Sequence, residues 1–234
     1  MSSRKEQKER LRQERLERER AAKEAQQRKR MVGYGAGGVL AIAAVAVIGF
    51  LALSGGSGNA STAVYPDGGS VPDQKTSNLT AAMKAAGCKQ TEEKGTSRSH
   101  VTSINAKIKY RTNPPTDGSH YFQAADDGAY DNPPPDVQLV HNLEHGRVVV
   151  WFKRTLPKQA RADLKAFLDE DTYQMVLAPR QNMPYDIAAS AWNRDPTPNG
   201  TGRLMSCPKY TPAVFDALRA FREANRSNGP EPVP

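Results

Sequence analysis

The feature that most constrains this chain is an uncharged, apolar stretch of 22 residues, Val32 to Leu53. At a rise of about 1.5 Å per residue, a helix of this length crosses a hydrocarbon core about 30 Å thick. The stretch is also longer than the roughly 7 to 15 apolar residues typical of a cleaved signal peptide. We therefore predict a single transmembrane helix over residues 32–53 that is retained as a signal anchor in the cell membrane.

The segment before this stretch is strongly charged. Residues 1–31 contain 12 Lys/Arg and 6 Glu, so they carry +6 of the chain's formal net charge of +8. Their composition favours helix but contains no apolar stripe, which predicts a charged, helical, cytoplasmic tail. The basic residues beside the apolar stretch favour a cytoplasmic N-terminus, with the C-terminal part outside the cytoplasm. They also suit contact with anionic lipid.

The chain after the apolar stretch is nearly neutral, with 21 Lys/Arg against 19 Asp/Glu. It lacks the basic excess of a nucleic-acid-binding surface, so we expect no nucleic-acid partner. The expected partner is the lipid bilayer, and nothing in the sequence identifies a protein partner. We predict a flexible Gly/Ser-rich linker over residues 54–76, one extracytoplasmic domain over residues 77–227, and a disordered tail over residues 228–234.

The extracytoplasmic domain is expected to be α+β, with a small mixed sheet and helices packed over it. An apolar run on both faces of one strand indicates that residues 147–153 form a central strand. Further strands are predicted at residues 100–110, 173–178 and 186–192. Helices are predicted at residues 79–86, 137–145 and 157–168, with a last helix that begins at Pro212. The expected helix caps are Ser77 or Asn78 for the first of these helices, Asp136 for the second and Thr211 for the last.

The chain has two cysteines, Cys88 and Cys207, both after the apolar stretch. Outside the cytoplasm, a pair of cysteines in one domain is best interpreted as a disulfide. A redox or metal-bound pair would more often show Cys-x-x-Cys spacing, which is absent. We therefore predict a disulfide between Cys88 and Cys207.

The four histidines of the chain fall in three short segments. Alternation along residues 100–110 places His100 on the inward face of its strand, and His120 ends a loop made rigid by two prolines. His141 and His145 lie four residues apart and project from one face of a helix. Three or four convergent imidazoles suit zinc or copper, so these histidines are the candidate metal ligands.

Other interpretations of these segments remain open. Met183 could add a thioether ligand if the metal were copper, although a single Met is usually core filler. The order His-x-x-Glu-His resembles the inverted zincin pattern, in which Glu144 would be the catalytic base of a zinc-dependent hydrolase. No second helix supplies the third ligand of that pattern, however. The histidines could instead form a structural hydrogen-bond cluster in a non-catalytic envelope scaffold.

Two motifs carry a resemblance to a known family. Asn113–Tyr121 reads Asn-Pro-Pro-Thr-Asp-Gly-Ser-His-Tyr, and His141–Gly146 reads His-Asn-Leu-Glu-His-Gly. Together they resemble a bacterial, membrane-anchored family of unknown function, which has an Asn-Pro-Pro-Thr-Ser-Gly-x-His-Tyr loop and a His-x-Leu-Glu-His-Gly element. Asp117 and Ser119 depart mildly from the usual loop. The resemblance covers roughly residues 88–192 and implies an anchored ectodomain, but no established activity.

Overall fold

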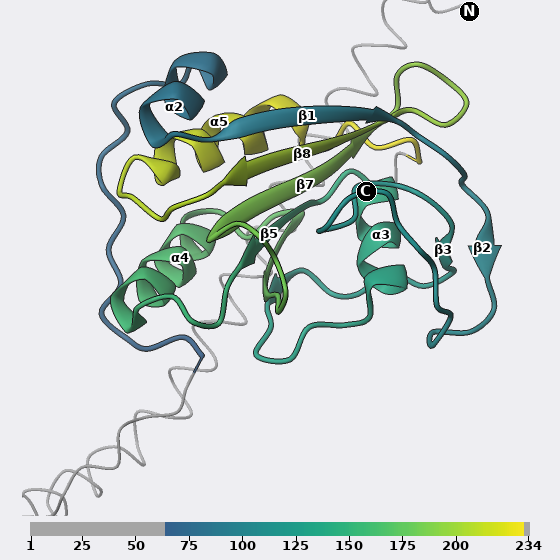
Figure 1. Cartoon of the computed structure of the whole chain (residues 1–234), viewed down its shortest axis with the longest axis horizontal. Helices are drawn as coiled ribbons and strands as arrows, with labels where there is room; N and C mark the ends of the chain where they lie inside the picture. The colour runs from purple at the N-terminus through teal and green to yellow at the C-terminus, as the bar shows by residue number, and fades with distance from the viewer. Residues whose placement is uncertain (1–63, 232–234) are drawn as a thin grey trace, which may run out of the picture. The chain divides into compact units, whose positions relative to one another are not determined.

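A computed structural model describes residues 64–231 of the protein (Figure 1). The predicted cytoplasmic tail, the predicted transmembrane helix at 32–53 and the first part of the predicted linker, residues 54–63, lie outside the described residues. Among the residues that are described, no helix is both long and apolar enough to cross a bilayer. The described part is α+β, as expected.

The largest element is a six-stranded mixed sheet, which agrees with the predicted architecture. Along the sheet the strands are β1 (Lys89–Lys94), β8 (Thr201–Cys207), β7 (Ile187–Asn193), β5 (Val148–Phe152), β6 (Met175–Pro179) and β4 (Gly128–Ala129). The pairings from β1 to β5 are antiparallel, whereas β5, β6 and β4 run parallel. The predicted central strand is therefore confirmed, since β5 pairs on both sides and all its residues are buried.

Helices cover both faces of this sheet (Figure 1). Three of them share one core: α2 (Leu79–Ala86), α4 (Lys158–Glu170) and α5 (Val214–Asn225). The fourth, α3 (Asp136–Glu144), packs on a second core. Strand β5 contributes to both cores, because its side chains alternate between the two faces of the sheet. The first core contains Val148, Val150 and Phe152, and the second contains Val149 and Trp151.

Local signals account for some helix ends. The Asn78 side chain accepts a hydrogen bond from the Ala81 amide, and Gly87 ends α2 with φ +68°, as predicted. The other two predicted caps are wrong. Asp136 is the first residue of α3, and its carboxylate binds Arg180 at 2.6 and 2.9 Å. Helix α5 begins at Val214 and has no side-chain cap, so Thr211 does not cap it.

The predicted strand over residues 100–110 is also wrong beyond its first two residues. Only β2 (His100–Val101) forms a ladder, and it pairs in parallel with β3 (His120–Tyr121). Ile104 and Ile108 are half-buried between exposed neighbours. The alternation along this segment therefore reflects the packing of one face against the domain. Beyond Val101, no neighbouring strand in the described chain forms backbone hydrogen bonds with it.

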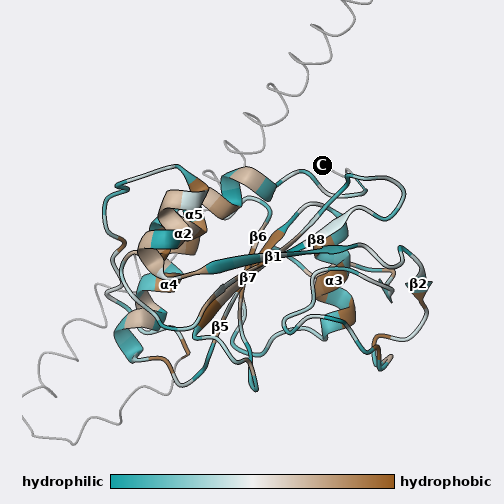
Figure 2. Cartoon of the chain, turned by 45° about the horizontal axis from the view of Figure 1, so that its top comes forward, coloured by the Kyte–Doolittle hydropathy of each residue, from teal (hydrophilic) through white to brown (hydrophobic). Residues whose placement is uncertain are grey.

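Strands β1 and β8 were not predicted, although the disulfide that joins them was. Five of the six residues of β1 are charged or polar with long side chains, and the strand is hydrophilic along most of its length in Figure 2. It lies at the sheet edge, where both of its faces can be solvated. Cys88 and Cys207 form the predicted disulfide where β1 begins and β8 ends, with Cα atoms 4.2 Å apart.

Both ends of the described chain pack against the domain, which differs from the expected linker and tail. Val64 is buried, and the Tyr65 hydroxyl lies within hydrogen-bond distance of two backbone carbonyls, that of Leu177 in β6 and that of Tyr130 just after β4. At the other end, the Ser227 amide donates to the Gly146 carbonyl, and the Glu231 amide donates to the Glu144 carbonyl. Backbone hydrogen bonds, which composition does not predict, hold residues 227–231 against the end of α3.

Candidate metal centre

The two-stranded sheet positions two of the histidines. In the parallel pair of β2 and β3, His100 lies directly opposite His120, and their ring centroids are 4.8 Å apart. This small sheet lies beside α3 (Figure 1). His120 is fully buried and its ring meets the edge of Trp192, whereas 44% of the His100 side chain is exposed. One ligand candidate therefore lies deep in the domain and the other at its surface.

The proline-rich loop orients the His120 ring. Asp117 anchors the loop, because its buried carboxylate accepts hydrogen bonds from the Thr96 amide and hydroxyl at 3.0 and 2.9 Å. Gly118 takes a φ of +122°, a conformation that favours glycine. Its carbonyl accepts a hydrogen bond from His120 Nδ1 at 2.7 Å. The proton of the neutral ring therefore lies on Nδ1, which leaves a lone pair on Nε2.

Helix α3 supplies the other buried donors. His141 and Glu144 lie one turn apart, and both side chains are buried. His141 Nδ1 donates to the Tyr121 carbonyl at 2.6 Å, so its Nε2 also carries a lone pair. Both buried rings thus bind backbone carbonyls through Nδ1. Metal-ligating histidines show this same supporting contact, which fixes the tautomer and the ring orientation.

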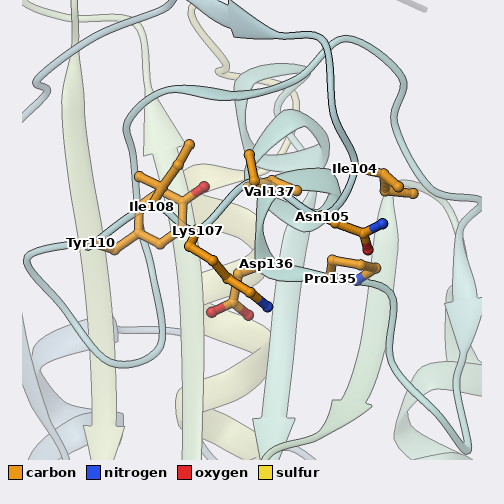
Figure 3. Close-up of a pocket in the computed structure, with 9 residues that line it drawn as sticks. Ile104, Asn105, Lys107, Ile108, Tyr110, Pro135, Asp136 and Val137 are labelled. Carbon is orange, nitrogen blue, oxygen red and sulfur yellow. The ribbon is translucent and has the colours of Figure 1, made fainter.

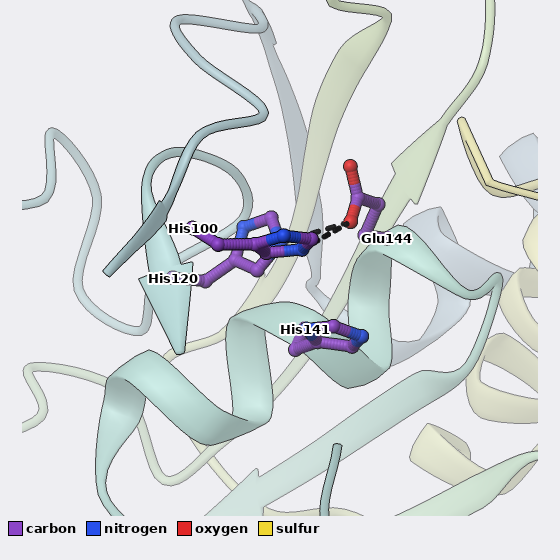
Figure 4. Close-up of side chains that lie close together, drawn as sticks. All are labelled: His100, His120, His141 and Glu144. Carbon is purple, nitrogen blue, oxygen red and sulfur yellow. Dashed lines mark ion pairs between the residues drawn. The ribbon is translucent and has the colours of Figure 1, made fainter. Parts of the chain in front are cut away.

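Four side chains converge at this point (Figure 4). One donor atom from each lies within 4.8 Å of all the others: these belong to His100, His120, His141 and Glu144. Glu144 Oε2 is 2.9 Å from His120 Nε2 and 3.7 Å from His100 Nε2. Bonds of about 2.1 Å in a tetrahedral zinc site imply ligand atoms roughly 3.4 Å apart, between these two distances. The group could hold a metal ion.

Two buried atoms in this group lack a hydrogen-bond partner. They are His120 Nε2 and Glu144 Oε2, which face each other although neither forms a hydrogen bond of acceptable geometry. With the His120 proton on Nδ1, a lone pair would face a carboxylate oxygen, which is repulsive. A cation between the two atoms, either a proton or a metal ion, removes that repulsion. A buried group left without a partner costs about 1–3 kcal/mol.

The surroundings of the site favour an ionised Glu144 and neutral His141 and His145 rings. Burial alone would raise the pKa of Glu144, but the contact with His120 and the hydrogen bond and charge of Arg98 outweigh it and lower that pKa to about 2. Arg98 Nε binds Glu144 Oε1 at 2.7 Å. Burial lowers the pKa of His141, and burial with the neighbouring His141 and Arg147 lowers the pKa of His145 to about 4. Metal ligation requires these protonation states.

The structure thus brings three of the four predicted histidines together, with Glu144 as a fourth donor. His145 belongs to an adjoining group with Glu144 and Glu231. Met183 is buried in the core that α3 covers. Sequence reasoning missed Arg98 and Glu231, and no local motif marks either residue. Their positions depend on the β2–β3 pair and on the C-terminal segment.

A separate pocket of about 280 Å³ lies at the other end of α3 (Figure 3). It is formed by the irregular segment after β2 and the first turn of α3. Its lining combines apolar side chains with one Lys and one Asp: Ile104, Asn105, Ala106, Lys107, Ile108, Tyr110, Pro135, Asp136 and Val137. No group of metal-ligating side chains converges there among the described residues. The histidine cluster is therefore the stronger candidate site.

A family profile described as a protein of unknown function, DUF3105, matches residues 100–231. The chain belongs to the DUF3105 family. No curated protein and no solved structure matches it. The DUF3105 range contains all four histidines, Glu144 and Glu231, whereas Arg98 and the first strand of the sheet precede it. Membership assigns no activity, so the proposed function depends on the geometry.

Proposed function

We propose that this DUF3105 protein is a single-pass membrane protein whose extracytoplasmic domain binds a divalent transition metal ion, zinc or copper, through His100, His120, His141 and Glu144. The observation that carries the metal proposal is that two buried atoms, His120 Nε2 and Glu144 Oε2, lie 2.9 Å apart and have no hydrogen-bond partner. An ion pair between His120 and Glu144 alone would not require the His100 and His141 rings to lie beside it. Three imidazoles and a carboxylate are a typical donor set for these metals.

The hydrogen bonds that orient the imidazole rings favour a preorganised metal site over a chance cluster of side chains. Each buried histidine donates its Nδ1 proton to a backbone carbonyl, at 2.7 Å for His120 and 2.6 Å for His141. Both Nε2 atoms are thereby left as ligands. His100 remains partly exposed, which provides a route by which an ion can enter.

Glu144 is proposed as a ligand rather than as a catalytic base. Its pKa of about 2 and its ion pair with Arg98 make it a weak proton acceptor at neutral pH. The remaining oxygen, Oε2, faces the histidines. These features favour metal binding over the zinc-dependent hydrolysis that the His-x-x-Glu-His order suggested.

The metal proposal is tested by metal content. The full-length protein, loaded with ZnCl₂ and desalted, should retain at least one zinc per chain by atomic absorption. His120→Ala should lose that zinc, because it removes the most buried ligand. A wild-type protein that retains neither zinc nor copper under these conditions would contradict the proposal.

The membrane proposal depends on the uncharged stretch at 32–53 and is supported by the disulfide, which persists in oxidising compartments. Alkaline phosphatase, which needs disulfides to fold, should be active when fused after Pro234. The same enzyme fused within residues 1–31 should be inactive. Activity only in the N-terminal fusion would reverse the proposed topology.

A further inference from the structure

A second set of donor atoms adjoins the proposed metal position at the end of α3. Glu144, His145 and Glu231 each place one ligand atom within 4.8 Å of the others. Glu144 belongs to both sets and has two carboxylate oxygens. One of them, Oε2, faces His120, and the other, Oε1, binds Arg98. A carboxylate shared by two donor sets can bridge two metal ions, one bound to each oxygen.

The two sets also meet through a contact between imidazoles. His141 Nε2 and His145 Nε2 are 2.8 Å apart. Because His141 carries its proton on Nδ1, His145 must donate from Nε2 in the metal-free protein. A metal ion on His141 Nε2 takes the lone pair that accepts this hydrogen bond. His145 then loses its acceptor, and the neutral ring can move its proton to Nδ1 and expose Nε2 as a ligand.

The C-terminal segment is built to hold Glu231 at this position. The Ser227 amide donates to the Gly146 carbonyl at 2.8 Å, and the Glu231 amide donates to the Glu144 carbonyl at 3.0 Å. Gly229 packs so closely that an added Cβ would lie 2.2 Å from the Glu144 carbonyl oxygen. Glu231 Oε2 lies 3.8 Å from His145 Nε2. Backbone contacts, rather than a flexible side chain alone, bring this carboxylate to His145.

We infer that the site is a two-metal centre, in which Glu144 bridges one ion on His100, His120 and His141 and a second ion on His145 and Glu231. This inference rests on the proposed function. Metal ions in such centres are typically about 3.5–4 Å apart, a distance that a bridging carboxylate can span. The second ion replaces Arg98 at Glu144 Oε1, and Arg98 can turn into solvent because 36% of its side chain is exposed.

Zinc stoichiometry of the full-length protein tests the inference. Wild type should bind two zinc ions per chain, whereas Glu231→Gln and His145→Gln should each bind one. Glu93→Gln is the matched control, because the exposed fractions of the Glu93 and Glu231 side chains are 46% and 44%. This control should still bind two zinc ions. Glu231 is partly exposed, so Glu231→Gln leaves the core intact even if His145→Gln fails to fold.

Copper provides a second measurement, because two Cu(II) ions this close are magnetically coupled. The copper-loaded wild type should show far less EPR signal than its copper content predicts, and Glu231→Gln should restore the signal of an isolated ion. One metal ion per wild-type chain, unchanged by Glu231→Gln, would overturn the two-metal centre and leave the proposed function intact. No bound metal in the wild type would overturn both.

Discussion

His120 Nε2 lies 2.9 Å from Glu144 Oε2, and both side chains are buried. His120 comes from a short strand after a proline-rich loop, and Glu144 is the last residue of α3. The contact joins the two-stranded sheet to the helix. A cation at this point would neutralise the carboxylate and satisfy the imidazole lone pair, so the strength of metal binding should depend on Glu144.

Replacing Glu144 with Gln should weaken zinc binding by at least about 100-fold, because loss of even a supporting residue at a metal site costs about 10- to 100-fold. Isothermal titration calorimetry of the full-length protein measures this change. Glu170→Gln is the control, since Glu170 also pairs with an arginine, Arg219, at 2.6 Å, but in the part of the domain that α5 covers. Equal zinc affinity in Glu144→Gln and wild type would contradict a ligand role.

Asp117 should affect metal affinity without touching the metal. Asp117→Ala removes the acceptor of two hydrogen bonds from Thr96, which frees the loop whose Gly118 carbonyl orients His120. We expect zinc affinity to fall by about 10- to 100-fold in the same titration. Asp163→Ala, which removes an acceptor of the Ser70 amide and the Tyr210 hydroxyl, should leave zinc affinity unchanged.

The metal-free protein should lose stability as the pH falls from about 6.5 to about 4. An unfolded histidine takes up a proton near pH 6.5, whereas burial, His141 and Arg147 lower the pKa of folded His145 to about 4. The unfolded state therefore binds more protons in this window, and the free energy of unfolding falls by up to about 1.4 kcal/mol per pH unit for each such histidine.

Guanidinium denaturation in EDTA at several pH values measures this slope. His145→Gln cannot take up the proton, so its slope between pH 6.5 and 4 should be shallower than that of the wild type. Below pH 4.5 a second loss should begin, because the pKa of Glu144 is lowered to about 2 and its ion pairs weaken only as it is protonated. A wild-type stability independent of pH between 6.5 and 4 would contradict the buried, neutral state of His145.

The end of α3 depends on Gly146, which has a φ of +79°. Gly146→Ala should destabilise the protein by more than the roughly 1–2 kcal/mol of left-handed backbone strain, because the new Cβ would lie 2.9 Å from the Gly229 amide nitrogen. Gly87→Ala is the matched control: its φ is +68°, but no atom lies within 4 Å of the added Cβ. Equal losses in thermal unfolding would show that residues 227–231 do not pack on α3.

The disulfide should contribute a large share of the domain's stability. It closes a loop of 119 residues, and the chain-entropy model assigns about 4–5 kcal/mol to a closure of that length. Reducing agent should therefore lower the denaturation midpoint of the wild type strongly. The double variant Cys88→Ser/Cys207→Ser should have the lower midpoint already and be insensitive to reductant. An unchanged wild-type midpoint under reducing conditions would argue against the bond.

The amino-acid sequence by itself determined those features that depend on neighbouring residues. An apolar run on both faces predicted the buried strand β5, and a Gly after an amphipathic stretch predicted the end of α2. Histidine positions in two short motifs predicted the candidate ligands His120 and His141. The disulfide followed from the presence of two cysteines in one domain.

Only the tertiary structure decided which distant segments meet. Polar β1 joins the sheet through its backbone, and backbone hydrogen bonds also hold the segment that carries Glu231 against α3. Alternation along residues 100–110 cannot reveal that just two of them pair with β3. Backbone hydrogen bonds form between any residues except at proline, so side-chain patterns carry little information about them. For that reason the sequence indicates the imidazoles, while only the fold places Arg98 and Glu231 beside Glu144.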